Sequence, residues 1–123
     1  MENILAGWAS FLAPIVMKYP DVPSLTAELE ESFCTADPNI TKRFARVTFF
    51  SDHRKEMQQL DIPVLILQCS DDSIAPKNIG DYLHKAVNCS VLVKMEATGN
   101  CSHMSHPEET IKAIKNFLEP TSN

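Results

Sequence analysis

The stretch "IPVLILQCS", from Ile62 to Ser70, limits the fold of this chain more than any other part of the sequence. It is a nearly continuous apolar run, with a proline near its start and two aspartates directly after it. A strand that is buried on both faces has this composition, and such strands occur in parallel sheets that helices cover on each side. The chain therefore needs cover for both faces of this strand.

The residues after this run alternate between helix and strand patterns. We expect a helix over "APKNIGDYLHKAV", a second strand over Ser90–Ala97 and a closing helix over Pro107–Leu118. This β-α-β-α order predicts an α/β fold with two parallel strands. Two parallel strands form an unusually small sheet with both edges unpaired, which indicates part of a larger sheet. Either the first-half helices cover this sheet, or further strands are supplied from elsewhere.

Four short amphipathic helices are expected in the first half of the chain. The first contains Pro14, which predicts a kink or an early end. The second follows "YPDVP", with Ser24 as a candidate N-cap. The third has the most regular start signal, with Asp37 at the N-cap and Pro38 at the first helical position. The fourth is "SDHRKEMQQL".

Charge and cysteine usage exclude several classes of function. A formal net charge of −5 gives no electrostatic reason to expect nucleic acid or an anionic membrane as a partner. No apolar run approaches the length of a membrane span, and no secretory signal pattern is found, so we expect a cytoplasmic location. The four cysteines have neither C-x-x-C nor Cys/His ligand spacing, which favours free thiols. We predict no cofactor and no metal.

Two loops that follow the predicted strands carry the candidate chemistry, "SDDSIAP" and "TGNCSHMSHP". In open α/β sheets, functional groups gather at the carboxyl ends of the strands. An acid on the first loop and a histidine on the second is the late part of the Ser…Asp…His order of α/β-hydrolases. In that arrangement the acid orients the imidazole, and the imidazole takes the serine proton. The adjacent aspartates Asp71 and Asp72 are interpreted as strand-end turn residues in preference to a cation site.

Three strings resemble the RsbQ-like α/β-hydrolases, which are stress-response (sigma-B) regulators, and more loosely their plant relatives, the strigolactone and karrikin receptors. The strings are "IPVLILQCSDDSIAP", "VKMEATGNCSHMSHPEETI" and "ELEESFCTADPNITKRFARVTFFSDHR". The resemblance implies a helical lid over residues 1–60 and the C-terminal β-α-β-α part of a hydrolase core over residues 61–123. It also implies that Asp72 matches the catalytic acid. The residue after Gly99 matches the catalytic histidine, and this chain has Asn100 there.

The chain departs from this family at two catalytic positions. An amide cannot take a proton near neutral pH and return it, so Asn100 leaves the site without a general base. The family also has histidines at the positions of His103 and His106. We therefore expect these two residues to cap or pack the loop, and whether either can replace the base stays open. The nucleophile motif G-x-S-x-G needs two glycines four residues apart, which the three glycines of this sequence do not provide. The nucleophile is therefore absent from the sequence.

Other aromatic and histidine side chains have less specific interpretations. Periodicity places a set of phenylalanines in a helix-packing core, whereas the resemblance to a lid favours a pocket for some of them: Phe33, Phe44, Phe49 and Phe50. His53 and His84 lie on predicted helix surfaces, and we expect both to be solvated.

Together these features predict a truncated RsbQ-like hydrolase without catalysis of its own. Two alternatives stay open. The chain could be a signalling module whose helices bind a small apolar or lactone-like ligand, or a signalling protein partner. It could also be the second half of a split ester or lactone hydrolase.

Overall fold

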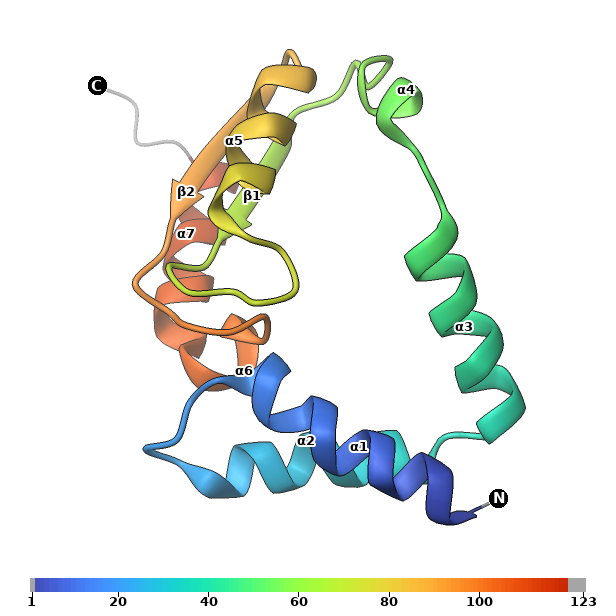
Figure 1. Cartoon of the computed structure of the whole chain (residues 1–123). Helices are drawn as coiled ribbons and strands as arrows, with labels where there is room; N and C mark the ends of the chain where they lie inside the picture. Colours follow the sequence, from blue (N-terminus) through green and yellow to red (C-terminus); the bar gives the residue numbers. More distant parts are fainter. Residues whose placement is uncertain (1, 120–123) are drawn as a thin grey trace.

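A computed structural model describes residues 2–119 of the chain, with side chains from residue 6 onward. Four helices come first, and a β-α-β segment with two further helices follows (Figure 1). In chain order the elements are α1 (Glu2–Met17), α2 (Pro23–Thr35), α3 (Pro38–Phe50), α4 (Arg54–Met57), β1 (Val64–Gln68), α5 (Lys77–Ala86), β2 (Ser90–Lys94), α6 (Ser102–Ser105) and α7 (Pro107–Leu118). Among the described residues, no helix combines the length and the apolar character that a membrane crossing needs.

The two strands form a parallel sheet, as the sequence predicts. β1 and β2 pair in register from Val64 opposite Ser90 to Gln68 opposite Lys94. Helix α5 lies on one face of the sheet and α7 on the other (Figure 1). Both faces of the apolar run are thus covered, although the core beneath is small. Its buried members are Cys69, Met95 and Ala97, with Leu67 and Val93 packed against them.

The second strand is shorter than the sequence predicts, because it ends at Lys94 and not at Ala97. The backbone amides of Glu96 and Ala97 donate to the carboxylate of Glu109 in α7, at 2.7 and 3.1 Å. The Glu109 carboxylate thus accepts from two backbone amides that the strand pairing does not use. Strand β2 therefore ends at Lys94, and α7 holds the segment that follows it through Glu109.

Helices α1 and α2 pack against each other as an antiparallel pair (Figure 1). Trp8 and Phe33 meet between them with ring centroids 5.5 Å apart. Along α1, the fully buried residues Ala9, Ala13 and Met17 recur every four positions and form one face.

The early end predicted at Pro14 and the N-cap predicted at Ser24 are both wrong. Pro14 does not end α1, since the amide of Lys18 donates to the Pro14 carbonyl at 2.9 Å and closes one more turn. Ser24 does not cap α2, which begins at Pro23 with Val22 as an N-cap that lacks a side-chain bond. A proline at the first helical position is preorganised for the helix and has no amide to cap.

Helix α3 begins as predicted but packs differently. The Asp37 side chain accepts hydrogen bonds from the amides of Asn39 and Ile40, at 2.8 and 3.1 Å. In the described part of the chain, however, α3 packs closely against no other helix or strand, and no residue of it is buried. The core interpretation of its phenylalanines was therefore wrong: Phe44, Phe49 and Phe50 are 73, 67 and 84% exposed. Helical periodicity shows that a helix has an apolar face but does not show what covers it.

Candidate functional site

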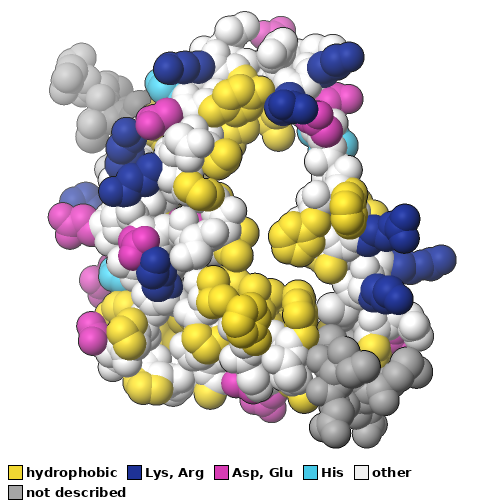
Figure 2. Space-filling model, in the orientation of Figure 1, with side chains coloured by type: hydrophobic (Ala, Val, Ile, Leu, Met, Phe, Trp, Pro, Cys, Tyr) yellow, Lys and Arg dark blue, Asp and Glu magenta, His cyan; other side chains and the backbone are white. Residues whose placement is uncertain are grey.

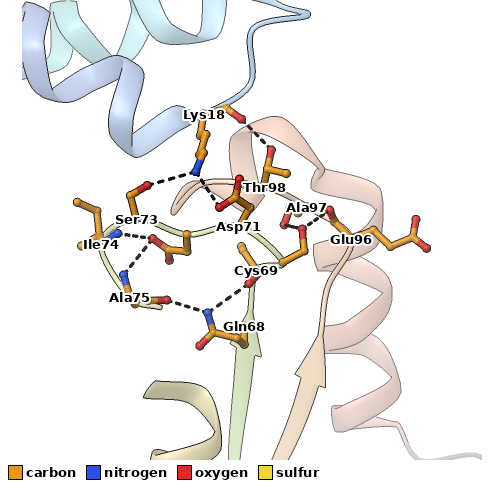
Figure 3. A network of polar contacts seen from close by, with 12 residues as sticks. Lys18, Gln68, Cys69, Asp71, Ser73, Ile74, Ala75, Glu96, Ala97 and Thr98 are labelled. Atoms are coloured by element: carbon orange, nitrogen blue, oxygen red, sulfur yellow. Dashed lines mark hydrogen bonds and ion pairs between the residues drawn. The ribbon is translucent and has the colours of Figure 1, made fainter. Parts of the chain in front are cut away.

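The two candidate loops lie side by side at the carboxyl end of the sheet (Figure 3). An isolated bridge joins Asp71 to Thr98 beyond the last strand residues. The Ser70 amide donates to the Ala97 carbonyl at 2.9 Å, and the Gly99 amide donates to the Asp71 carbonyl at 2.8 Å. Parallel pairing therefore resumes in the loops, shifted by one residue from the register of the strands, in which Gln68 lies opposite Lys94.

Asp72 organises the first of these loops. Its side chain is 9% exposed, and its Oδ1 accepts hydrogen bonds from the amides of Ile74 and Ala75 at 2.8 and 3.0 Å. An aspartate that bonds the backbone two and three residues ahead stabilises a turn. The sequence prediction that Asp72 is a turn residue is therefore confirmed.

The structure brings together the two residues that the sequence singles out. The Asn100 Nδ2 donates to the second carboxylate oxygen of Asp72, Oδ2, at 2.7 Å. The carboxylate thus accepts three hydrogen bonds, which orient it fully. The partner at position 100 is an amide, which donates one proton to this bond and does not titrate near neutral pH.

The C-terminal end of α1 forms the third wall of this site, which the sequence did not indicate. The Asn100 amide donates to the Val16 carbonyl at 2.7 Å, and Thr98 Oγ1 donates to the Lys18 carbonyl at 2.8 Å. These bonds use carbonyls that the end of a helix leaves without intrahelical partners. The second loop is therefore held against the first helix as well as against the first loop.

Lys18 strengthens this junction through its side chain. Its Nζ lies 2.7 Å from Asp71 Oδ1 and donates to Ser73 Oγ at 3.3 Å (Figure 3). Lys18 adopts a left-handed backbone conformation, with φ of 45°, which is uncommon for a residue other than glycine. No local sequence pattern distinguishes this lysine from a solvated one, because its partners lie more than fifty residues away in the chain.

Among the described residues, the two histidines of the second loop form no hydrogen bond or ion pair with Asp72. His103 is exposed, and His106 packs against Tyr19 with ring centroids 4.9 Å apart. His106 Nδ1 also lies 2.9 Å from Ser105 Oγ. His106 therefore packs the loop as expected, while His103 faces solvent. His53 and His84 are exposed, as predicted.

No family model matches the chain. A solved hydrolase from Oleispira antarctica superposes on 96% of this chain with a TM-score of 0.87 and 36% sequence identity. The chain has a partial α/β-hydrolase fold. The superposition covers 45% of the Oleispira protein, and the enol-lactonase from Burkholderia xenovorans LB400 shows the same fold at 19% identity, with a TM-score of 0.84 over 93% of this chain and 45% of that one.

Three curated relatives of this chain carry esterase names. The pimeloyl-[acyl-carrier protein] methyl ester esterase of Neisseria meningitidis is 33% identical over 69 residues, which are 56% of this chain and 27% of that protein. Strigolactone esterase RMS3 of Pisum sativum is 25% identical over 87% of this chain and 40% of its own length. A probable esterase of rice, Oryza sativa subsp. japonica, is 24% identical over 97% of this chain and 44% of its own length. The chain is thus related to the strigolactone esterases, and it spans less than half the length of each relative.

Within this hydrolase fold, no group of described residues forms a metal site. The charged depression between α4 and α5, about 480 Å³ in volume, is lined by side chains that do not include the Asp72–Asn100 pair: Asp52, Arg54, Lys55, Glu56 and Tyr82. The Arg54 guanidinium holds the pKa of Asp52 down at about 2. Asp52 and Arg54 form an ion pair at 2.6 Å, and Glu56 lies 3.9 Å from His53.

Two buried thiols, those of Cys69 and Cys101, lie beside the site formed by Asp72 and Asn100. Burial raises the pKa of Cys69 and also that of Cys101, so both stay protonated at neutral pH. Because the thiolate is the reactive form, we expect Cys34 and Cys89, which are exposed, to react first with a thiol reagent. Ellman's reagent at pH 8 should label two thiols quickly and the other two only on denaturation. Rapid labelling of all four in the native chain would contradict this assignment.

Proposed function

We propose that this chain is the lid and the acid-bearing part of an RsbQ-like α/β-hydrolase, and that by itself it does not turn over a substrate. In this proposal residues 1–60 act as the lid and residues 61–123 as the C-terminal part of the core. The observation that carries the proposal is the bond from Asn100 Nδ2 to Asp72 Oδ2, at 2.7 Å. It puts an amide at the place where a hydrolase needs an imidazole held by its acid.

The chemical consequence follows from the residue types. In this proposal Asp72 keeps the role of the acid, which orients its partner and would stabilise positive charge on an imidazolium. Asn100 cannot carry that charge, because an amide does not accept a proton in this pH range. The sequence also contains no G-x-S-x-G elbow that would present a serine to this pair. In this proposal, the general base that would transfer the proton and the nucleophile that would attack the substrate are therefore both missing.

Ester hydrolysis by the purified chain tests this proposal. We expect p-nitrophenyl acetate and butyrate to be hydrolysed at the rate of the buffer alone. The variant Asn100→His should be equally inactive, since it restores an imidazole and not a nucleophile. Turnover by either protein that Asp72→Ala abolishes would overturn the proposal.

A ligand-binding role is the second candidate. It is supported by the relation to the strigolactone esterases and by the exposed aromatic side chains of Phe11 and Phe44. In this role the helices would hold a small apolar or lactone-like molecule, and the complex could then signal to a protein partner. Calorimetry with a butenolide lactone would show saturable heat that Phe44→Gln weakens. A folded chain that gives no heat with such lactones would exclude this role.

A further inference from the structure

A buried polar side chain, that of Gln68, ends strand β1. In the view of Figure 2, many charged side chains project from the outside of the molecule, whereas Gln68 is only 6% exposed. Burial of an amide is costly unless its polar atoms find hydrogen-bond partners. The Gln68 Nε2 donates to the Ala75 carbonyl at 2.9 Å and to the Cys69 carbonyl at 3.3 Å (Figure 3). Its Oε1 accepts from the Gly80 amide at 3.0 Å, so both polar atoms have partners.

Ala75 connects this side chain to the candidate site. The amide of Ala75 donates to Asp72 Oδ1 at 3.0 Å, while its carbonyl accepts from Gln68 Nε2. Residue 75 is therefore held on both sides, by the carboxylate and by the Gln68 side chain. The other carboxylate oxygen of Asp72 accepts from Asn100 Nδ2 at 2.7 Å. A series of hydrogen bonds thus links Gln68 through Ala75 and Asp72 to Asn100.

The same side chain also binds the start of helix α5. This helix has no side-chain cap at its own N-cap residue, Pro76. The first amides of a helix lack intrahelical partners, and Gln68 Oε1 supplies an acceptor for one of them, that of Gly80. A Cβ at Gly80 would lie 2.6 Å from Gln68 Oε1 and 3.0 Å from Gln68 Cβ. Glycine at position 80 therefore lets α5 approach the strand end this closely.

We propose that Gln68 is a positioning residue for Asp72, which orients the carboxylate by tying Ala75 to the first turn of α5. The inference rests on the proposed function, in which Asp72 keeps the role of the acid. A glutamine amide offers a donor to the loop and an acceptor to the helix at once. Glutamate of the same length keeps the acceptor and loses the donor, and methionine loses both. The role of Gln68 therefore depends on its hydrogen bonds and not on its volume.

Nuclear magnetic resonance of the Asn100 side-chain amide in the full 123-residue chain tests this proposal. The Nδ2 hydrogen that faces Asp72 should exchange slowly with water, and the absence of its signal from Asn100→Ser identifies it. In Gln68→Met we expect this exchange to become roughly tenfold faster, because the loop loses the bond that fixes the carboxylate. Gln68→Glu should accelerate it similarly, while the Gly80 amide keeps its acceptor and stays protected.

The variant Gly80→Ala disturbs the same hydrogen bonds from the side of α5. Alanine normally stabilises a helix relative to glycine. At this position, however, the added Cβ would displace Gln68 Oε1, so the Asn100 exchange should accelerate as it does in Gln68→Met. This variant changes neither Gln68 nor the loop, and it decides the question if Gln68→Met does not fold.

Ser90→Ala is the matched control, since it removes a hydrogen bond at the other end of α5. Ser90 Oγ donates at 2.7 Å to the carbonyl of Val87, the C-cap residue of this helix. The Asn100 exchange rate should change less than about twofold in this variant, because effects at distant sites are independent.

Two results would overturn the proposal. The first is an unchanged Asn100 exchange rate in the folded variants of Gln68 and Gly80. The second is an equal acceleration in Ser90→Ala, because the exchange would then follow stability alone. Ester hydrolysis by the chain that Asp72→Ala abolishes would refute the proposed lack of turnover, and it would leave these exchange rates as they are.

Discussion

Replacing Gly99 with alanine is expected to lower the free energy of unfolding by about 4 kcal/mol, near the upper end for a single substitution. Gly99 has φ of 72°, where a residue with a Cβ is strained. A Cβ at this position would lie 2.1 Å from the Met17 carbonyl oxygen and 2.6 Å from that of Val16. Both obstacles are backbone atoms of α1, so no side-chain rotation relieves them.

The strain would spread from the loop to the first helix. If α1 moves away to admit the new methyl group, the 2.7 Å bond from the Asn100 amide to the Val16 carbonyl is lost. The bond from Thr98 Oγ1 to the Lys18 carbonyl, which spans 80 residues of sequence, is lost with it. We therefore expect α1 to become detached from the site loops even in molecules that keep the sheet.

Urea denaturation followed by circular dichroism measures this effect, and Gly7→Ala is its matched control. Gly7 lies within α1, and a Cβ there would meet no atom within 4 Å. Alanine at this position should stabilise the chain by up to about 1 kcal/mol, through higher helix propensity. A Gly99→Ala variant that is as stable as Gly7→Ala would contradict the close approach of α1. A variant that does not fold at all is the same result at larger magnitude.

The sequence was sufficient to predict the sheet and the neighbouring loops. The apolar run from Ile62 to Ser70 required cover on both faces, and α5 and α7 provide it. Parallel pairing then placed the two strand ends at one edge, and the family resemblance singled out Asp72 and Asn100 on the two loops that follow these strands. These inferences depend on periodicity and chain order, which are local properties of a sequence.

Contacts between distant segments could not be predicted in the same way. Glycine is unfavourable within a helix, yet Gly80 lies in α5, where its amide donates to Gln68 Oε1 at 3.0 Å and a Cβ would lie 2.6 Å from that oxygen. Likewise, nothing near Lys18 in the sequence indicates that its side chain pairs with Asp71. Such positions are determined by how closely two backbones approach, and that distance depends on the packing of the whole molecule.

Replacing Asp72 with alanine is the second change with a large expected effect, a loss of about 3 kcal/mol in the free energy of unfolding. Asp72 is 9% exposed, and its carboxylate accepts hydrogen bonds from two loop amides and from Asn100 Nδ2. Alanine would leave these three donors without their acceptor, and each unpaired donor that stays buried adds a desolvation penalty. The neighbouring variant Asp71→Ala should lose no more than about 1 kcal/mol, since its ion pair with Lys18 is largely solvated.

Denaturation of the two alanine variants and of Asp72→Asn separates the structural role of this carboxylate from a catalytic one. An asparagine keeps one acceptor oxygen for the Ile74 and Ala75 amides, so its stability should fall between that of the parent chain and Asp72→Ala. If this order is observed, the turn accounts for an aspartate at position 72 even in a chain that has no base at position 100. If Asp72→Ala is no less stable than Asp71→Ala, the carboxylate does not hold the loop, and its contact with Asn100 would need an explanation in binding or catalysis.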